Sequence, residues 1–173
     1  GEDVTAAIHK MIRDSITAAV QEIVAPEKLV QRYHLDQVRD KYVGIFLKPT
    51  DLNYSVEQLN EWDYDVDQLS EELIELAEKV YAAREAELTP AVMREVERVV
   101  LLRTVDEHWM NHIDAMHELR QGVGLNAYAQ RNPVDEYKNQ GFEMFEEMVA
   151  SICEQTVRMI FTVRIQGDAP KRE

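Results

Sequence analysis

Residues 105–165 constrain the fold of this chain more than any other stretch, because they hold two long helical patterns separated by a short polar segment. Apolar residues recur three and four positions apart on both sides of that segment, which is the spacing of one face of an α-helix. Two long helices joined by about ten residues must lie side by side. The stretch therefore predicts an antiparallel helical hairpin.

Glycine and proline mark the expected ends of these two helices. We expect Gly122 and Gly124 to close the first helix near Gln121, because glycine accepts the left-handed conformation found at helix ends. Asn132 can cap the second helix, and Pro133 suits its first position, where the missing N–H costs nothing. The polar segment between these ends forms the predicted tip of the hairpin.

The tip carries one aromatic residue, Tyr128, flanked by short polar and alanine residues. Polar loops on rigid helices often present a contact to a partner. An exposed tyrosine offers a large contact surface and a hydroxyl while losing little side-chain entropy. The alternative is that Tyr128 folds back onto the hairpin, and composition alone slightly favours it.

The rest of the chain also has helical periodicity. We expect one helix of about 20 residues from Val4 that ends at Pro26, and a second from Leu35 to Phe46 that ends before Pro49. A short helix around 56–62 and a long one over 67–87 follow, and Thr89-Pro90 then opens the first helix of the hairpin. No segment alternates with period two, so the fold class predicted is all-α: a long hairpin plus a smaller helical domain.

Composition excludes several classes of protein. The net charge is −14, and residues 51–90 alone hold twelve acidic and two basic side chains. A specific nucleic-acid binder needs a basic face, so no nucleic-acid partner is expected. No run approaches the roughly 20 apolar residues that span a bilayer, and the N-terminal residues lack the pattern of a signal peptide. The single cysteine, Cys153, lies among apolar positions and is expected to be a buried structural residue.

His108 and His112 are the one candidate for metal chemistry. They are four residues apart on one helix, which is a spacing that metal ligands use, but Trp109 stands where a zinc-protease helix would carry its glutamate. We therefore expect no metal and no catalytic residue in this chain, with a metalloenzyme kept as an alternative that metal analysis would decide.

Residues 101–148 resemble the C-terminal region of the SecA family, the ATP-driven motors of bacterial preprotein export. The resemblance rests on DEHWMNHIDAM, LRQG, YAQRNP and EYKNQGFEMF, which are together long and specific. It implies that residues 1–24 are a segment of the helical scaffold, 25–88 the helical wing domain, 89–165 the scaffold's two-helix finger, and 166–173 a frayed tail.

The resemblance also implies that this chain is a non-catalytic fragment. The family's two nucleotide-binding domains and its preprotein cross-linking domain are not in the sequence, so ATP and Mg²⁺ are cofactors of the intact motor and none is expected here. The implied partners are the SecYEG channel, unfolded preprotein, the motor domains and a second copy of the chain. The implied location is cytoplasmic, at the inner face of the bacterial inner membrane.

In this family the finger tip enters the channel mouth, touches the translocating chain and helps restrain the motor's ATPase. The residues implied in that contact are Tyr128, Leu125, Asn126, Gln130, Arg131 and Arg120. Those implied in building the hairpin are Trp109, Gly122, Gly124, Pro133, Phe142 and Phe145.

Two points remain open from the sequence. The family often has Arg-Gly before the tip tyrosine, whereas this chain has Asn126-Ala127, so a cation at the tip is lost. A stand-alone helical adaptor or dimerisation module is the alternative function. The adaptor predicts fully buried apolar stripes, whereas the fragment predicts exposed apolar patches on the first helix and on one side of the hairpin.

Overall fold

The computed structural model describes residues 2–126 and 132–166, and within them it contains six helices and no strand. Helices α1 (Glu2–Val24), α2 (Arg32–Tyr42), α3 (Val56–Glu61) and α4 (Val66–Leu88) are followed by the two longest, α5 (Pro90–Asn126) and α6 (Pro133–Thr162). Two isolated β-bridges, Leu29 with Asp65 and Val43 with Leu47, hold the segments between α1, α2, α3 and α4 in place. The predicted all-α fold class is confirmed.

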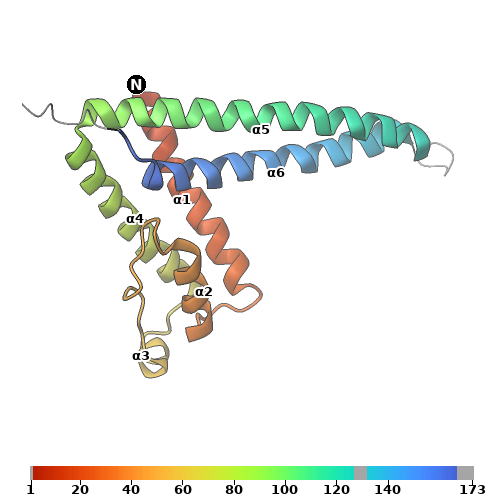
Figure 1. The fold of residues 1–173 in the computed structure, drawn as a ribbon. Helices are drawn as coiled ribbons and strands as arrows, with labels where there is room; N and C mark the ends of the chain where they lie inside the picture. The colour runs from red at the N-terminus through yellow and green to blue at the C-terminus, as the bar shows by residue number, and fades with distance from the viewer. Residues whose placement is uncertain (1, 127–131, 167–173) are drawn as a thin grey trace, which may run out of the picture.

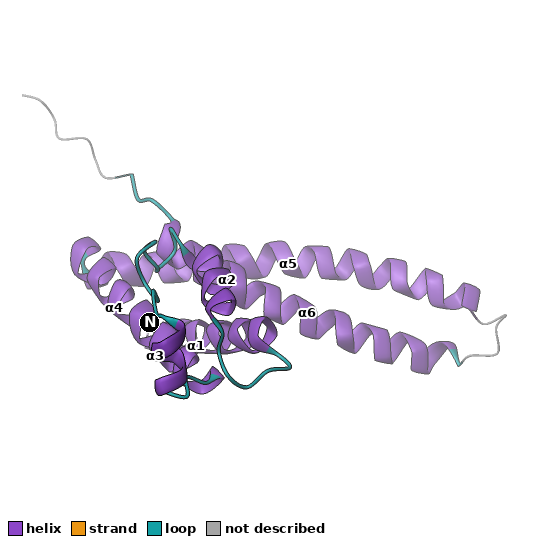
Figure 2. Cartoon of the chain, turned by 90° about the horizontal axis from the view of Figure 1, so that it is seen from below, coloured by secondary structure: helices purple, strands orange, loops and turns teal. Residues whose placement is uncertain are grey.

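Helices α5 and α6 lie antiparallel and form a long arm that projects from a base built by the other four helices (Figure 1). At about 1.5 Å per residue, α5 is roughly 55 Å long and α6 roughly 45 Å. Viewed from below, the far half of the arm extends beyond every other helix (Figure 2). The predicted hairpin is therefore present.

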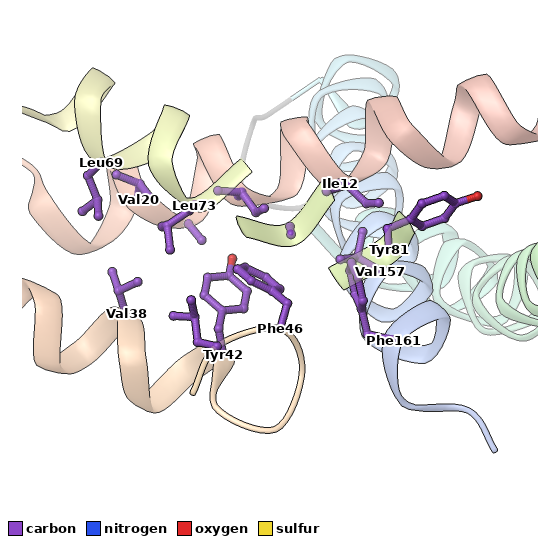
Figure 3. Close-up of a cluster of buried hydrophobic side chains, with 14 of the residues drawn as sticks. Ile12, Val20, Val38, Tyr42, Phe46, Leu69, Leu73, Tyr81, Val157 and Phe161 are labelled. Carbon is purple, nitrogen blue, oxygen red and sulfur yellow. The ribbon is translucent and has the colours of Figure 1, made fainter. Parts of the chain in front are cut away.

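Helix α1 organises the base because its apolar stripe is covered on several sides. Ile8, Ile12, Ile16, Val20 and Val24 recur at spacings of four and are all fully buried. They pack with α4 and with the C-terminal half of α6, where Val157 and Phe161 join the same core as Leu69 and Leu73 (Figure 3). The expectation that α1 would expose an apolar patch is wrong, since its exposed positions are polar or alanine.

Local capping explains why α3 and α4 begin where they do. Ser55 accepts a hydrogen bond from the backbone N–H of Gln58, whose side chain bonds back to Ser55, and Asp65 and Gln68 repeat this capping box at α4. Helix α2 ends at Tyr42, earlier than the periodicity predicts. The buried Phe46 belongs instead to a turn that folds back onto the core.

The predicted end of the first hairpin helix is also wrong. Gly122 and Gly124 lie inside α5, which continues to Asn126, and neither has a positive φ. The opening of α6 matches the sequence: the Asn132 side chain accepts a hydrogen bond from the N–H of Val134, and Pro133 occupies the first turn.

The base forms one core rather than two. Residues of α1, α2, α4, α5 and α6 all contribute to a single buried cluster. The boundaries of the wing at residues 25 and 88, and of the tail at 166, stay predictions. No helix in the described part of the chain is long and apolar enough to cross a membrane.

Candidate interaction surface on the helical hairpin

The two helices of the arm approach closely in its outer half, at Met116 of α5 and Gly141 of α6. A Cβ built on Gly141 of α6 would lie 2.9 Å from Cε of Met116 on α5, so glycine allows the two backbones to come together there. Farther along, Val123 is almost fully buried although it lies close to the end of α5. The seam between the helices therefore extends over most of the arm.

An aromatic cluster marks one face of the arm. The ring of His112 lies 5.7 Å from that of Trp109 and 5.9 Å from that of Phe145, so one imidazole contacts aromatic rings from both helices. Trp109 and Phe145 are nevertheless about half exposed, and Phe142 is 64% exposed. Aromatic side chains that are this accessible are typical of contact surfaces.

This exposed face continues into a groove beside α1. Phe142, Phe145 and Val149 line the groove on the α6 side, and Ala18 and Ala19 line it on the α1 side. Its volume is about 580 Å³. The rim is mainly acidic, with the carboxylates of Asp14, Glu22, Glu146 and Glu154 against the ammonium group of Lys41.

Exposed apolar side chains also lie on α5. They are Val99, Leu102, Val105, Met110 and Ile113, which are between 37% and 67% exposed. The predicted apolar patch on the hairpin is therefore confirmed. A stand-alone adaptor with fully buried stripes does not fit this surface.

Near its far end the arm combines apolar surface with a cation. Leu125 is 74% exposed, the highest fraction among the exposed large apolar residues described. Arg120 is exposed and lines an open groove of about 380 Å³ with Val123 and Tyr137. Sequence reasoning missed Val123 and Tyr137. Their signal was available, because both occupy apolar-periodic positions that face each other across the hairpin ends.

Several of the predicted contact residues lie outside the described part of the chain. Tyr128, Gln130 and Arg131 belong to residues 127–131, and Asn126 is described only as the last residue of α5. Arg120 and Leu125, the other two predicted contact residues, lie in the last two turns of α5. The alternative that Tyr128 folds back onto the hairpin concerns the same residues and lies outside the described part of the chain.

The two candidate metal ligands have other partners. His108 Nε2 is hydrogen-bonded to the side-chain oxygen of Gln155 on α6, and His112 packs between Trp109 and Phe145. Across residues 2–126 and 132–166, no group of three or more His, Cys, Asp or Glu side chains is placed to hold a metal ion.

Cys153 is half-buried rather than buried, and desolvation raises the pKa of its thiol.

Comparison with known proteins agrees with this architecture. Residues 1–164 match the family described as the SecA wing and scaffold domain. The chain belongs to this family. It is 40% identical to the protein translocase subunit SecA of Desulforudis audaxviator, over 95% of this chain and 19% of that protein. It is 42% identical to the SecA of Clostridium beijerinckii, over 99% of this chain and 20% of that protein.

The match to SecA is strongest in part of the chain. The SecA of Pelotomaculum thermopropionicum is 50% identical over 106 residues, which is 61% of this chain and 12% of that protein. The chain spans about a fifth of the length of the SecA subunits of D. audaxviator and C. beijerinckii. The activity of the whole SecA protein is therefore carried to this chain only as a proposal.

Proposed function

We propose that this chain is a non-catalytic part of a SecA-type protein export motor and that the end of its α5–α6 arm contacts the translocating preprotein and the SecY channel. The observation that carries the proposal is the arm itself, which projects from a packed base and presents exposed apolar side chains as far as Leu125. An arm that reaches away from its own core is suited to contact something outside it.

The construction of the arm suits a lever. Paired helices resist bending because their side chains interlock along a continuous seam, and protein interiors pack with few voids. Here the seam includes the close approach at Gly141 and the buried Val123. A force applied at the base can therefore reach the far end without being absorbed by the arm.

The end of the arm suits contact with chains of any sequence. Tyr128 can pack on varied side chains through its ring and can hydrogen-bond through its hydroxyl, so it need not recognise one residue type. Leu125 adds apolar surface, and Arg120 and Arg131 supply cations before and after Tyr128 in the sequence. We assign Asn126 and Gln130 as polar neighbours in the same contact.

Regulation of the motor's ATPase is the second part of the proposal. The nucleotide sites, with ATP and Mg²⁺, belong to other domains of the motor, so a change at the arm acts on hydrolysis through movement of the base. The partners are then SecYEG, unfolded preprotein and the motor domains, at the cytoplasmic face of the inner membrane. The match to the SecA family and the exposed arm support this role.

The test of the tip contact is Tyr128→Ala in the intact motor, with Tyr128→Phe as the matched control. We expect transport of a preprotein to fall with Tyr128→Ala while basal ATP hydrolysis persists, because the substitution removes contact surface from the tip and leaves the nucleotide sites untouched. Tyr128→Phe keeps the ring and is expected to retain most transport. Undiminished transport by the alanine variant would remove Tyr128 from the account.

A further inference from the structure

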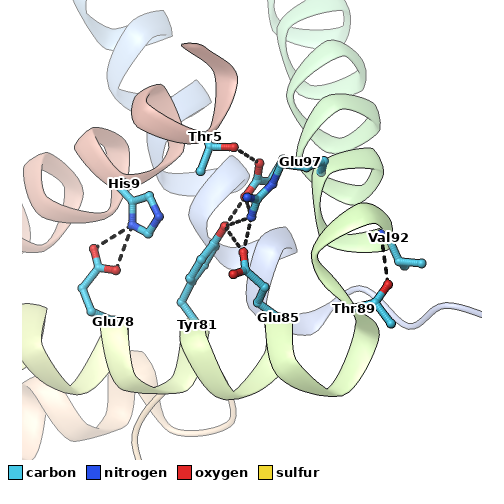
Figure 4. A network of polar contacts seen from close by, with 9 residues as sticks. Thr5, His9, Glu78, Tyr81, Glu85, Thr89, Val92 and Glu97 are labelled. Atoms are coloured by element: carbon cyan, nitrogen blue, oxygen red, sulfur yellow. Dashed lines mark hydrogen bonds and ion pairs between the residues drawn. The ribbon is translucent and has the colours of Figure 1, made fainter. Parts of the chain in front are cut away.

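A buried carboxylate lies where the arm joins the base. Glu97 of α5 is fully buried, and its two oxygens are held by side chains from different helices (Figure 4). The hydroxyl of Thr5 on α1 donates to Oε2 at 2.7 Å, and the hydroxyl of Tyr81 on α4 donates to Oε1. One acidic side chain therefore joins α1, α4 and α5.

A second charged residue completes the network. Nη2 of Arg94, one turn before Glu97 on α5, donates to Glu97 Oε1 at 3.1 Å and to the Tyr81 hydroxyl at 2.8 Å. The same nitrogen pairs with Glu85 of α4. The burial of Tyr81 and its bond to Glu97 raise the pKa of its hydroxyl, so it remains a protonated donor well into the alkaline range.

The network sits beside the abrupt change of direction between α4 and α5. Thr89 joins these helices with φ 82°, a left-handed value that is rare for a β-branched residue. A rare backbone conformation of this kind persists only where the surrounding contacts hold it. Polar contacts of Glu97 and Arg94 span α4 and α5 beside this junction.

Stability alone does not explain a buried carboxylate at this position. Removing a charge from water is costly, and replacing a buried ion pair with apolar residues of similar size is often neutral or stabilising. Hydrogen bonds, by contrast, are directional, so they discriminate between orientations that apolar packing tolerates about equally. The network is better suited to selecting one arrangement of helices than to adding free energy.

We propose that Glu97 is a positioning residue that fixes the angle of the α5–α6 arm relative to α1 and α4. Its carboxylate can be satisfied by Thr5, Tyr81 and Arg94 together only when the three helices meet at this angle. Loss of the carboxylate leaves the helices folded and releases their relative orientation. The importance of this angle for transport rests on the proposed function, whereas the angle itself can be measured without transport.

The experiment measures the angle as a distance between spin labels in the folded chain. Cys153→Ser removes the native thiol, and Glu71→Cys on α4 with Asn111→Cys on α5 provides one exposed label on the base and one on the arm. A second pair, Arg103→Cys with Glu118→Cys, lies wholly within α5. The 15 residues between these labels correspond to about 22 Å.

Glu97→Met is the informative variant, because methionine has a similar length and suits a buried site. We expect its thermal midpoint to fall, because the Thr5 and Tyr81 hydroxyls lose their acceptor. At a temperature well below that midpoint its helix content should match the parent's, while the distribution of distances between base and arm becomes at least about twofold wider or gains a second maximum. The pair within α5 should not change. Ile12→Val, which loosens the core without touching the network, should leave both distributions as they are.

Two further variants, each of which removes one of the hydroxyl donors to Glu97, cover the case in which Glu97→Met does not fold. Tyr81→Phe removes the donor from α4, and Thr5→Val removes the donor from α1, so each should broaden the distance between base and arm by less than the loss of Glu97. A distribution that stays as narrow as the parent's in every folded variant would overturn the proposal. That outcome would leave the Tyr128 transport test unaffected, so failure of the two proposals can be told apart.

Discussion

Gly141 of α6 and Met116 of α5 lie against each other across the seam of the arm. A Cβ on Gly141 would be 2.9 Å from Cε of Met116, which is the movable end of a flexible side chain. A single methyl group can therefore be accommodated there by a small rotation of the methionine. A branched side chain needs more room, because its further carbon atoms extend beyond a Cβ that is already in contact with the methionine sulfur, 3.5 Å away.

Substitution of Gly141 should consequently depend on size. We expect Gly141→Ala to change the free energy of unfolding by less than about 1 kcal/mol, since the gain in helix propensity offsets the contact with Met116. Gly141→Leu should destabilise by about 1–3 kcal/mol because it overpacks the seam. Urea denaturation of both variants measures the difference. Equal stability of the two would contradict the close approach.

Alanine at Gly122 or Gly124 tests where α5 ends. Both glycines are helical with open space around the position of a Cβ, so each substitution should stabilise the far end of the arm by up to about 1 kcal/mol. Amide hydrogen exchange of residues 115–125 would show this as slower exchange. Faster exchange would indicate the left-handed helix end that the sequence alone suggests.

The exposed face of the arm should make the isolated chain self-associate. Phe142, Phe145 and Leu102 present accessible apolar surface, and contiguous patches of this kind promote association. Sedimentation velocity at increasing protein concentration should show a shift toward larger species that Phe142→Ser reduces. Val56→Ser, at a 49% exposed apolar residue on α3, is the control and should not reduce it. A chain that stays monomeric at high concentration would contradict the proposed contact surface.

His34 should make the base sensitive to acid. Its Nδ1 accepts the backbone N–H of Gln31 at 2.9 Å and caps α2, which requires an unprotonated nitrogen. Burial lowers the pKa of His34 below its ordinary value of 6.5, and nearby Glu27 only partly opposes this. The unfolded chain therefore binds more protons than the folded one just below pH 6.5, so stability falls as the pH drops through that range.

Substitution of His34 by glutamine separates this effect from general acid denaturation. Glutamine can make the same capping contact but does not titrate near neutral pH. We expect His34→Gln to lose less stability between pH 7 and pH 5 than the parent, measured as the difference in free energy of unfolding at the two pH values. An identical loss in both proteins would show that His34 is not the group responsible.

Much of the fold could be predicted because local signals and tertiary packing agree. The stripe from Ile8 to Val24, the capping residue Asn132 and the start of α5 after Thr89 each follow from spacing or from cap chemistry. The C-terminal end of α5 could not be predicted in the same way. A helical glycine costs only about 1 kcal/mol, and burial of Val123 against α6 outweighs that cost.

The candidate interaction surface was likewise predictable only in part. Exposed apolar surface on one side of the hairpin was predicted, but the residues that form it were not: Phe142 and Phe145 were assigned to building the hairpin and are 64% and 45% exposed. The expected patch on α1 is absent because α4 and α6 cover that stripe, and sequence periodicity does not reveal which helices meet. The burial of Glu97 was missed for a related reason, since a glutamate on a long helix is normally exposed.

Crosslinking from the tip tests the central claim most directly. A photoreactive amino acid at position 128 of the intact motor, with a preprotein stalled in the channel, should form adducts with both the stalled chain and SecY. The same group at position 61, which is exposed on α3 in the base, should form none with the stalled chain. Adducts at 61 but not at 128 would show that the arm is not the part of this chain that meets the substrate.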